Sequence, residues 1–281
     1  MESENYGRSI TIQIDYSDLL LFPASIEEKI PMFMEQEADY IELLLDGSEW
    51  YDLASIYQEK VVSLKNLNVT YAIHPPAWGV NLAIENKELR NAALKQHITA
   101  LHFAYNIDAH YFVVHPGFYV SPLFHLHTAQ ELATEAVYTL YKEAKELGIK
   151  LVIENVGYNG TSLFTEQEYI SFVDQFDPNI IGYVLDTGHA YLNNWNIPNV
   201  IEQTSSRLWT MHLNDNHGVE DEHLPIGNGS INWELIFSAL HKQPQLPSYF
   251  LLEYGFDVNI KKLREHNQLL LNKIIQAHTS L

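Results

Sequence analysis

The sequence predicts a single (β/α)8 TIM barrel over residues 1–281, and three observations support this fold class. The chain has 281 residues, close to the roughly 250 that one such barrel usually needs. Short runs of β-branched and aromatic residues alternate with longer segments of helical periodicity, which is typical of βα units around a parallel sheet. Most of the short runs end in a polar side chain that can bind a metal ion. Residues 1–8 are expected to form a flexible N-terminal tail.

Eight short runs have the composition of buried strands, and each is followed by a segment of helical periodicity. A chain of eight βα units is what a closed barrel requires. The predicted strands are Ser9–Tyr16, Tyr40–Asp46, Val69–Pro75, His110–Pro116, Lys150–Val156, Ile180–Asp186, Leu208–Asp215 and Tyr249–Gly255.

The clearest helix begins at Thr128. Its apolar residues, among them Leu132, Ala136 and Leu140, recur every three or four positions, and Gly148 is expected to end it. No linker rich in Ser, Gly or Pro divides the chain, so one domain is expected. The longest irregular segment, Asn214–Asn232, follows the seventh strand, and loops in that position face the functional end of a barrel.

The composition limits the possible functions. Hydrophobic residues make up 46% of the chain and charged residues 19%, so a sizeable core can form. No stretch approaches the roughly 20 apolar residues of a membrane span, and we expect a cytoplasmic protein with no membrane partner. The formal charge of -20 disfavours a nucleic-acid partner. Cysteine is absent, so a metal ion would need nitrogen and oxygen ligands.

Six of the eight predicted strands end in a side chain that can bind a metal ion. In a parallel barrel these ends meet at one rim, so the six side chains should converge. They are His74, His115, Glu154, Asp186, His212 and Glu253.

Three further candidates lie close to these strand ends. His189 follows Asp186 by three residues, which lets both side chains reach one ion. Asp221 and His223 alternate in the long segment after the seventh strand, so both can point the same way. A lone strand-end histidine is more often structural than a ligand, and a lone acid is commonly a helix cap. However, burying four carboxylates together is costly without cations, so the whole set favours a metal site.

Other residues could contact a substrate. Glu42, in the second strand, points either into the barrel or into the pocket, and a structural role and a substrate contact are both open. Trp78, with Phe118, Tyr119, Tyr158 and Trp195, falls after a strand and could wall a cavity or cap the barrel. The remaining histidines are interpreted as structural or solvated: His97, His102, His110, His125, His127, His217, His241, His266 and His278.

Two chemistries fit this arrangement. In one, a single ion held by Glu154, Asp186, His212 and Glu253 polarises a sugar carbonyl while a glutamate moves the neighbouring proton, which gives isomerisation or epimerisation. In the other, all nine groups hold two or three ions that promote hydrolysis of a phosphodiester. The ligand types permit zinc, manganese, cobalt or iron.

From about Ile41 to Tyr254, the chain resembles the xylose isomerase-like TIM-barrel superfamily. This superfamily includes endonuclease IV (AP endonuclease family 2) and sugar phosphate isomerases and epimerases. The fragments that carry the resemblance are IHPPAWGVNL, VVHPG, VIENVGYNGTSLF, LDTGHA, MHLNDN and DEHLPIGNGSINW.

The resemblance implies two nested sets of ligands. Similarity to ketose 3-epimerases implies one metal ion on Glu154, Asp186, His212 and Glu253, with Glu154 and Glu253 as catalytic acid and base and His189 contacting the substrate. Similarity to endonuclease IV implies a trinuclear zinc site with nine ligands: His74, His115, Glu154, Asp186, His189, His212, Asp221, His223 and Glu253.

Departures from both groups bear on the choice. The segment Asn214–Glu220 is shorter than the matching loop of endonuclease IV, and His217 is its only possible cation. Trp78 is offset from that family's aromatic residue. The arginine that the epimerases place after the seventh strand is missing. The compact Asp-Glu-His-Leu-Pro-Ile-Gly run followed by Ile-x-Trp looks more like the sugar phosphate isomerase and epimerase members.

The leading hypothesis is a metal-dependent sugar or sugar-phosphate isomerase or epimerase that acts on a small carbohydrate with one to three divalent ions, zinc first among them. The alternatives are an endonuclease IV-like phosphodiesterase and a metal-binding barrel without catalysis. The charge of -20 and the short loop favour the first.

Overall fold

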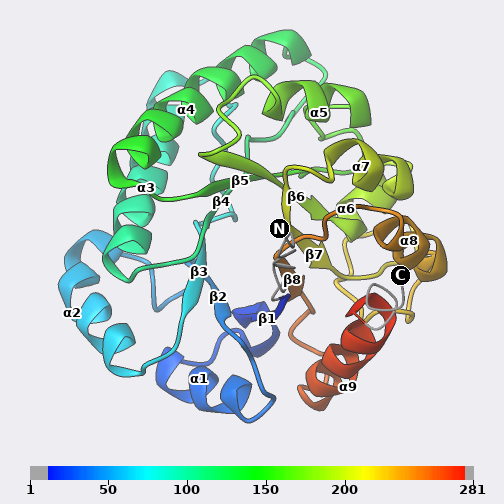
Figure 1. Cartoon of the computed structure of the whole chain (residues 1–281). Helices are drawn as coiled ribbons and strands as arrows, with labels where there is room; N and C mark the ends of the chain where they lie inside the picture. The colour runs from blue at the N-terminus through cyan, green and yellow to red at the C-terminus, as the bar shows by residue number, and fades with distance from the viewer. Residues whose placement is uncertain (1–11, 276–281) are drawn as a thin grey trace, which may run out of the picture.

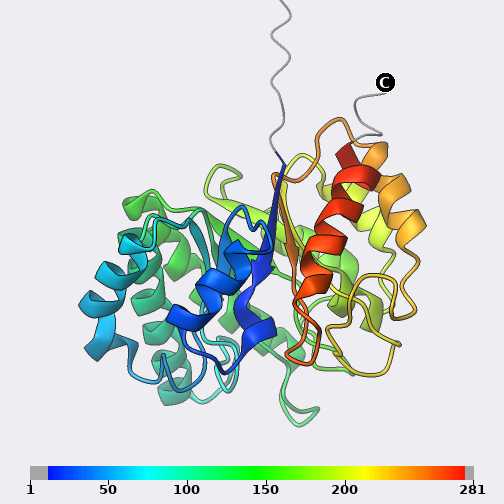
Figure 2. The ribbon, with the colours of Figure 1, turned by 90° about the horizontal axis from the view of Figure 1, so that it is seen from below.

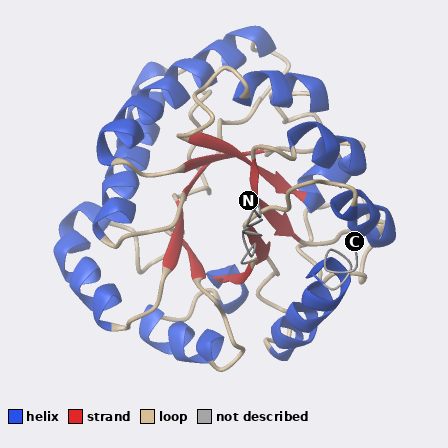
Figure 3. Ribbon diagram, in the orientation of Figure 1, coloured by secondary structure: helices blue, strands red, loops and turns tan. Residues whose placement is uncertain are grey.

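The computed structural model describes residues 12–275 as a closed barrel of eight parallel strands surrounded by helices (Figures 1 and 3). Each strand pairs with the next along the chain, and β8 closes the barrel against β1. The predicted (β/α)8 TIM barrel is therefore confirmed. The tail predicted at residues 1–8 lies outside the described residues. The strands are β1 (Gln13–Ser17), β2 (Ile41–Leu44), β3 (Tyr71–His74), β4 (Phe112–Val114), β5 (Leu151–Glu154), β6 (Ile181–Asp186), β7 (Leu208–Leu213) and β8 (Tyr249–Leu252).

Helices follow the strands and cover the outside of the barrel (Figure 3). Two of them, α6 and α7, come after β6. The helices are α1 (Ile26–Met34), α2 (Leu53–Asn66), α3 (Lys87–Asn106), α4 (Leu126–Leu147), α5 (Glu166–Val173), α6 (Thr187–Leu192), α7 (Ile197–Thr204), α8 (Trp233–His241) and α9 (Lys261–Leu270), with the shorter turns η1 (Asp18–Leu21) and η2 (Leu271–Ile275). Within residues 12–275, none of these helices is long and apolar enough to cross a bilayer.

All eight predicted strands are present, but most are shorter than the sequence suggested. The fourth, expected over His110–Pro116, is β4 over Phe112–Val114. The expected ends contain prolines and polar groups that leave the ladder of backbone hydrogen bonds at the rim. The helix expected from Thr128 begins two residues earlier, at Leu126. Gly148 ends it as expected, with a φ of 76° and its N–H donating to Ala144 O.

The inside of the barrel is closed at its amino-terminal end. Side chains alternate between the two faces of a strand, and Tyr40, Tyr111 and Tyr249 face inward at the start of their strands. Their ring centroids lie 5.4 to 6.1 Å apart, and the hydroxyls of Tyr40 and Tyr111 are 3.2 Å apart. In Figure 2, β1 begins at the upper side of the molecule, so the carboxyl ends of the strands face the lower side. A substrate must therefore enter from the carboxyl-terminal rim.

Candidate metal centre

A cavity of about 270 Å³ opens at the carboxyl-terminal rim of the barrel. Seven of the nine predicted ligands line it, and the other two, Asp186 and His212, are fully buried. The cavity therefore brings together residues from the ends of four strands, from α6 and from the loop between β7 and α8, as the strand-end pattern predicted. The seven lining ligands are His74, His115, Glu154, His189, Asp221, His223 and Glu253.

Four buried residues form what we call the strand-end group: Glu154, Asp186, His212 and Glu253. One ligand atom from each lies within 4.8 Å of the others. Glu154 and Asp186 are the last residues of β5 and β6, and Asp186 is the register partner of His212 on β7. Because neighbouring parallel strands end at the same height, one polar residue at each end suffices to build the group.

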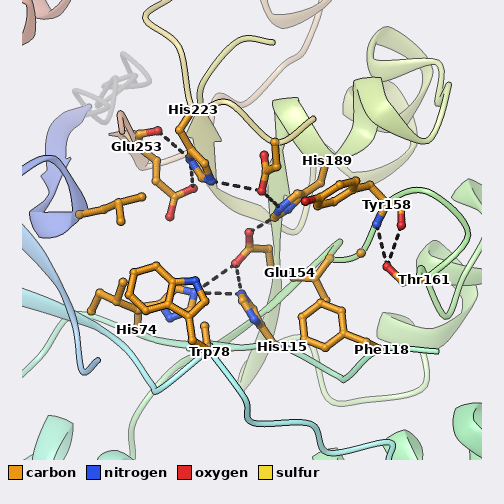
Figure 4. Close-up of a pocket in the computed structure, with 16 residues that line it drawn as sticks. His74, Trp78, His115, Phe118, Glu154, Tyr158, Thr161, His189, His223 and Glu253 are labelled. Atoms are coloured by element: carbon orange, nitrogen blue, oxygen red, sulfur yellow. Dashed lines mark hydrogen bonds and ion pairs between the residues drawn. The ribbon is translucent and has the colours of Figure 1, made fainter. Parts of the chain in front are cut away.

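His74, His115 and Glu154 form a second cluster, called here the histidine-pair group. The Nε2 atoms of the two histidines are 2.9 Å apart, and His115 Nε2 is 2.9 Å from Glu154 Oε2. His74 Nδ1 lies 2.8 Å from Pro75 O and donates to it, which leaves Nε2 facing the cavity. The carboxylate of Glu154 lies between the histidine pair on one side and His189 on the other (Figure 4). Glu154 thus belongs to both groups.

Asp221 and His223 form the loop pair, which completes the rim. Asp221 Oδ2 is 3.0 Å from His189 Nε2 and 3.2 Å from His223 Nε2. His223 Nδ1 donates to the backbone carbonyl of Glu253 at 3.0 Å. The loop pair therefore faces His189 and the end of β8 together.

Asp215 holds the loop that carries this pair. Its carboxylate accepts hydrogen bonds from the backbone N–H groups of Asn216, Gly227 and Ile231, at 2.9 to 3.1 Å, and from Trp233 Nε1 at 2.8 Å. One buried carboxylate thus ties together both ends of the segment between β7 and α8.

Asp186 is fixed by two asparagines that the sequence reasoning missed. Asn155 makes paired hydrogen bonds with the backbone of Asp186, at 2.8 and 3.0 Å. Asn214 Nδ2 donates to Asp186 Oδ2 at 2.7 Å. Gly188 makes room for this contact, since a Cβ there would lie 2.0 Å from Asn214 Oδ1. The signal was available in the sequence, because each asparagine directly follows or closely follows a strand-end ligand.

The buried acids and histidines around the cavity strongly shift one another's pKa values. Burial raises the pKa of Glu253, but His212 and His223 outweigh it and lower the value to about 2. Burial lowers the pKa of His212, but the charges of Glu42, Glu253 and Glu154 hold it well above its usual value. Burial alone would also lower the pKa of His74, which Glu154 raises to about 9. Without a metal ion, protons on these histidines balance the buried carboxylates.

The residues fit a divalent metal ion. Several buried ligand atoms have no hydrogen-bond partner within residues 12–275, including His212 Nδ1, His189 Nδ1, Glu253 Oε2 and Asp221 Oδ1. Buried polar atoms normally have partners, and unpaired buried carboxylates are costly. Imidazole nitrogens and carboxylate oxygens are suitable ligands for zinc and for manganese, cobalt or iron.

The remaining predicted contact residues fall into two classes. Trp78, Phe118 and Tyr158 line the cavity, whereas Tyr119 and Trp195 do not. Trp78 is 57% exposed and packs edge-on against Phe22 (Figure 4 shows Trp78 beside the histidine pair). Glu42 is fully buried and does not line the cavity, which favours the structural alternative over a direct substrate contact.

The other histidines lie away from the strand-end group. His97 contacts Ala93 O, and His266 contacts the Tyr254 hydroxyl. His102 and His217 contact the acids Glu143 and Glu222. His278 lies outside the described residues.

Comparisons with known proteins agree with the fold and show the family. The sequence model described as "Xylose isomerase-like TIM barrel" matches residues 35–273. A probable endonuclease 4 of Halothermothrix orenii is 28% identical over 210 residues, which cover 68% of this chain and 74% of that protein.

Two solved structures have the same fold. A D-tagatose 3-epimerase-like protein superposes with a TM-score of 0.80 at 20% identity, covering 96% of this chain and 99% of the other. The IolI protein with a bound zinc atom superposes with a TM-score of 0.76 at 16% identity, again covering 96% and 99%.

Proposed function

Because the chain belongs to the xylose isomerase-like TIM-barrel family, we propose that it is a divalent-metal-dependent sugar isomerase or epimerase. The observation that carries the proposal is the strand-end group, in which three carboxylates and one imidazole converge at the cavity. When bound there, a divalent ion polarises a carbonyl and its neighbouring hydroxyl.

Glu154 and Glu253 are the two groups proposed to move the proton. Both line the cavity, and each approaches His212 Nδ1, at 3.6 and 3.5 Å. The pKa of each is held below its usual value by the neighbouring histidines, against the opposing effect of burial. Both are therefore ionised at neutral pH, so one can take a proton from the carbon next to a carbonyl and the pair can return it. His189, between Glu154 and Asp221, is proposed to contact the substrate.

The cavity favours a small, unphosphorylated carbohydrate. Its volume lies just below the roughly 300–1,000 Å³ of usual ligand pockets. Trp78 and Phe118 offer aromatic faces against which the C–H face of a sugar can pack. No Lys or Arg within residues 12–275 lines the cavity, whereas phosphate groups are commonly bound by such side chains. A free sugar therefore fits these walls better than a sugar phosphate.

Zinc is the ion proposed first, with manganese, cobalt or iron as alternatives. The mixture of imidazole and carboxylate ligands suits zinc. The two groups that share Glu154, together with the loop pair, could hold one to three ions.

A second candidate function is hydrolysis of a phosphodiester, as in an endonuclease IV-like enzyme. The histidine-pair group favours it, because a one-ion epimerase does not need those ligands. The net charge of -20 and the absence of Lys or Arg from the described cavity lining oppose it, since binding to nucleic acid depends on cationic contacts.

Deuterium exchange distinguishes the candidates. Protein loaded with zinc, manganese or cobalt is incubated in D2O with a panel of ketoses and inositol-like sugars, and proton NMR follows the position next to the carbonyl. We expect loss of that proton signal with at least one sugar, and its retention in Glu253→Gln. Efficient nicking of abasic-site duplex DNA without exchange in any sugar would instead support the phosphodiesterase. If neither exchange nor nicking is observed, both enzymatic proposals fail and a metal-binding barrel without catalysis is supported instead.

A further inference from the structure

Glu42 is a buried acid below the cavity that the proposed reaction does not use. It lies on β2 two residues after Tyr40, so strand alternation turns it toward the inside of the barrel. It is completely inaccessible to solvent. Neither of its carboxylate oxygens has a hydrogen-bond partner within residues 12–275. Barrel interiors are usually filled by branched apolar side chains, so a glutamate here calls for an explanation.

The nearest cationic group to this carboxylate is the imidazole of His212. Glu42 Oε2 lies 3.5 Å from His212 Nε2, which is an ion-pair distance longer than an ordinary hydrogen bond, and neither atom has another hydrogen-bond partner within residues 12–275. His212 is also fully buried. An isolated buried carboxylate is strongly unfavourable, whereas one that faces an N–H of an imidazole is compensated.

The two nitrogens of His212 face different partners. Nδ1 points to the strand-end group, at 3.6 Å from Glu154 Oε1 and 3.5 Å from Glu253 Oε2. Nε2 points the opposite way, to Glu42. A proton held on Nε2 by Glu42 leaves the lone pair of Nδ1 directed at the other ligands.

We propose that Glu42 is a positioning residue for the metal centre, which fixes His212 in the tautomer whose Nδ1 binds the ion. The proposal rests on the metal-dependent function proposed above. It assigns Glu42 a role through His212 rather than a direct contact with substrate.

A comparison with His74 and His223 shows how the partner of the outer nitrogen differs at His212. His74 and His223 donate their outer N–H to neutral backbone carbonyls, of Pro75 and Glu253. His212 faces a carboxylate instead, and an anionic partner makes an imidazole a more basic ligand than a carbonyl does. Of these three histidines, His212 is therefore the one whose affinity for the ion depends most on its outer partner, whereas the carboxylate that His189 contacts, Asp221, is itself a predicted ligand.

Asp15 provides a matched control. It lies on β1, is also completely buried, and also has two carboxylate oxygens without a hydrogen-bond partner in the described part of the chain. No hydrogen bond or ion pair joins it to His212 among these residues, although its charge acts on both Glu42 and His212. Its removal therefore tests the loss of a nearby buried charge without the direct contact to the imidazole.

The test measures zinc and manganese affinity by competition with a chelator in four proteins: wild type, Glu42→Leu, Glu42→Gln and Asp15→Asn. We expect Glu42→Leu to bind about 10- to 100-fold more weakly. Gln keeps an acceptor for Nε2–H, so Glu42→Gln should be weakened less. Asp15→Asn should stay within about twofold of wild type. Removing one member of this buried pair should also lower the melting temperature of the metal-free Glu42→Leu protein, so its affinity is measured at a temperature where circular dichroism shows it folded.

A second measurement does not depend on the variants folding. Nitrogen-15 NMR of the metal-loaded wild type should show a protonated Nε2 and a metal-bound Nδ1 at His212. A metal-bound Nε2, wild-type affinity in Glu42→Leu, or an equal loss in Asp15→Asn would each overturn the role of Glu42 while leaving the metal-dependent function standing. A wild-type protein that binds neither ion would overturn both proposals.

Discussion

The strand-end group and the histidine-pair group share Glu154, but the barrel supports them differently. Asp186, His212 and Glu253 are all buried, and Asp186 is held on both oxygens, by the backbone N–H of His189 and by Asn214. In the histidine-pair group, two Nε2 atoms face each other at 2.9 Å, and His115 remains partly exposed. The first group is buried and contains three carboxylates, one of them held by two hydrogen bonds, whereas the second needs a proton or an ion between its two facing nitrogens. We infer that the strand-end group binds its ion more tightly.

The largest effect is expected from Glu154→Gln, because this residue belongs to both groups. Deuterium exchange should fall by about 10³-fold or more, since a ligand and a proton-transferring group are lost together. Elemental analysis should find little metal per purified chain. Glu59→Gln, an exposed change on α2, is the control and should have no effect. Full metal content in Glu154→Gln would place the ion elsewhere.

The second-largest expected effect is a rise of metal affinity with pH. In the metal-free protein the pKa of His74 is about 9 and that of His223 about 10, because the charges of Glu154 and Asp221 outweigh burial. Below these values an ion must displace protons, so affinity should rise with pH, by about tenfold per pH unit for each proton displaced. Calorimetry in buffers of different ionisation enthalpy should detect proton release near pH 7. Binding that is independent of pH between 6 and 9 would contradict this.

A smaller effect is expected from His115→Ala, which separates the two groups. It removes a ligand from the histidine-pair group and leaves the strand-end group intact. If the strand-end ion performs the reaction, deuterium exchange should fall less than about tenfold, although the number of bound ions should decrease. A loss as large as that of Glu154→Gln would mean that both groups act together, as in the phosphodiesterase.

The smallest effect is expected from Trp78→Ala at the mouth of the cavity. More than half of this side chain is exposed, so only part of it can pack against a substrate. The KM for the sugar should rise about threefold to tenfold, in keeping with an aromatic contact worth about 0.5–1.5 kcal/mol, while kcat changes little. Steady-state kinetics checks this. A large fall in kcat with an unchanged KM would place Trp78 in the chemistry.

The sequence predicted the barrel because six of the eight predicted strands run directly into a candidate ligand. The pattern in LVIENV and YVLDTGH fixes both the strand and the height of its last side chain, since parallel strands end at one rim. The orientation of Glu42 could not be read in the same way. Whether a side chain in mid-strand reaches the cavity depends on the number of layers inside the barrel, which only the closed structure shows.

The two asparagines that hold Asp186 stand next or close to strand-end ligands in the sequence, but the sequence alone does not show that Asp186 is their partner. Asn155 and Asn214 lie 31 and 28 residues from it and meet it only because β5, β6 and β7 are neighbours in the barrel. The strand ends were overestimated for a related reason. The predicted fourth strand ran to Pro116, for example, whereas the backbone pairing of β4 stops at Val114.

The anchoring of the loop pair by Asp215 has a consequence for how a candidate site of this kind can change. Both ligands of that pair lie on one surface segment, and one carboxylate, with four donors, holds that segment to the barrel. A change of sequence between these anchor points could therefore add or remove two ligands at once without disturbing the strands. The four residues at the strand ends would then stay the same while the exchange of one loop changes how many further ligands the candidate site offers.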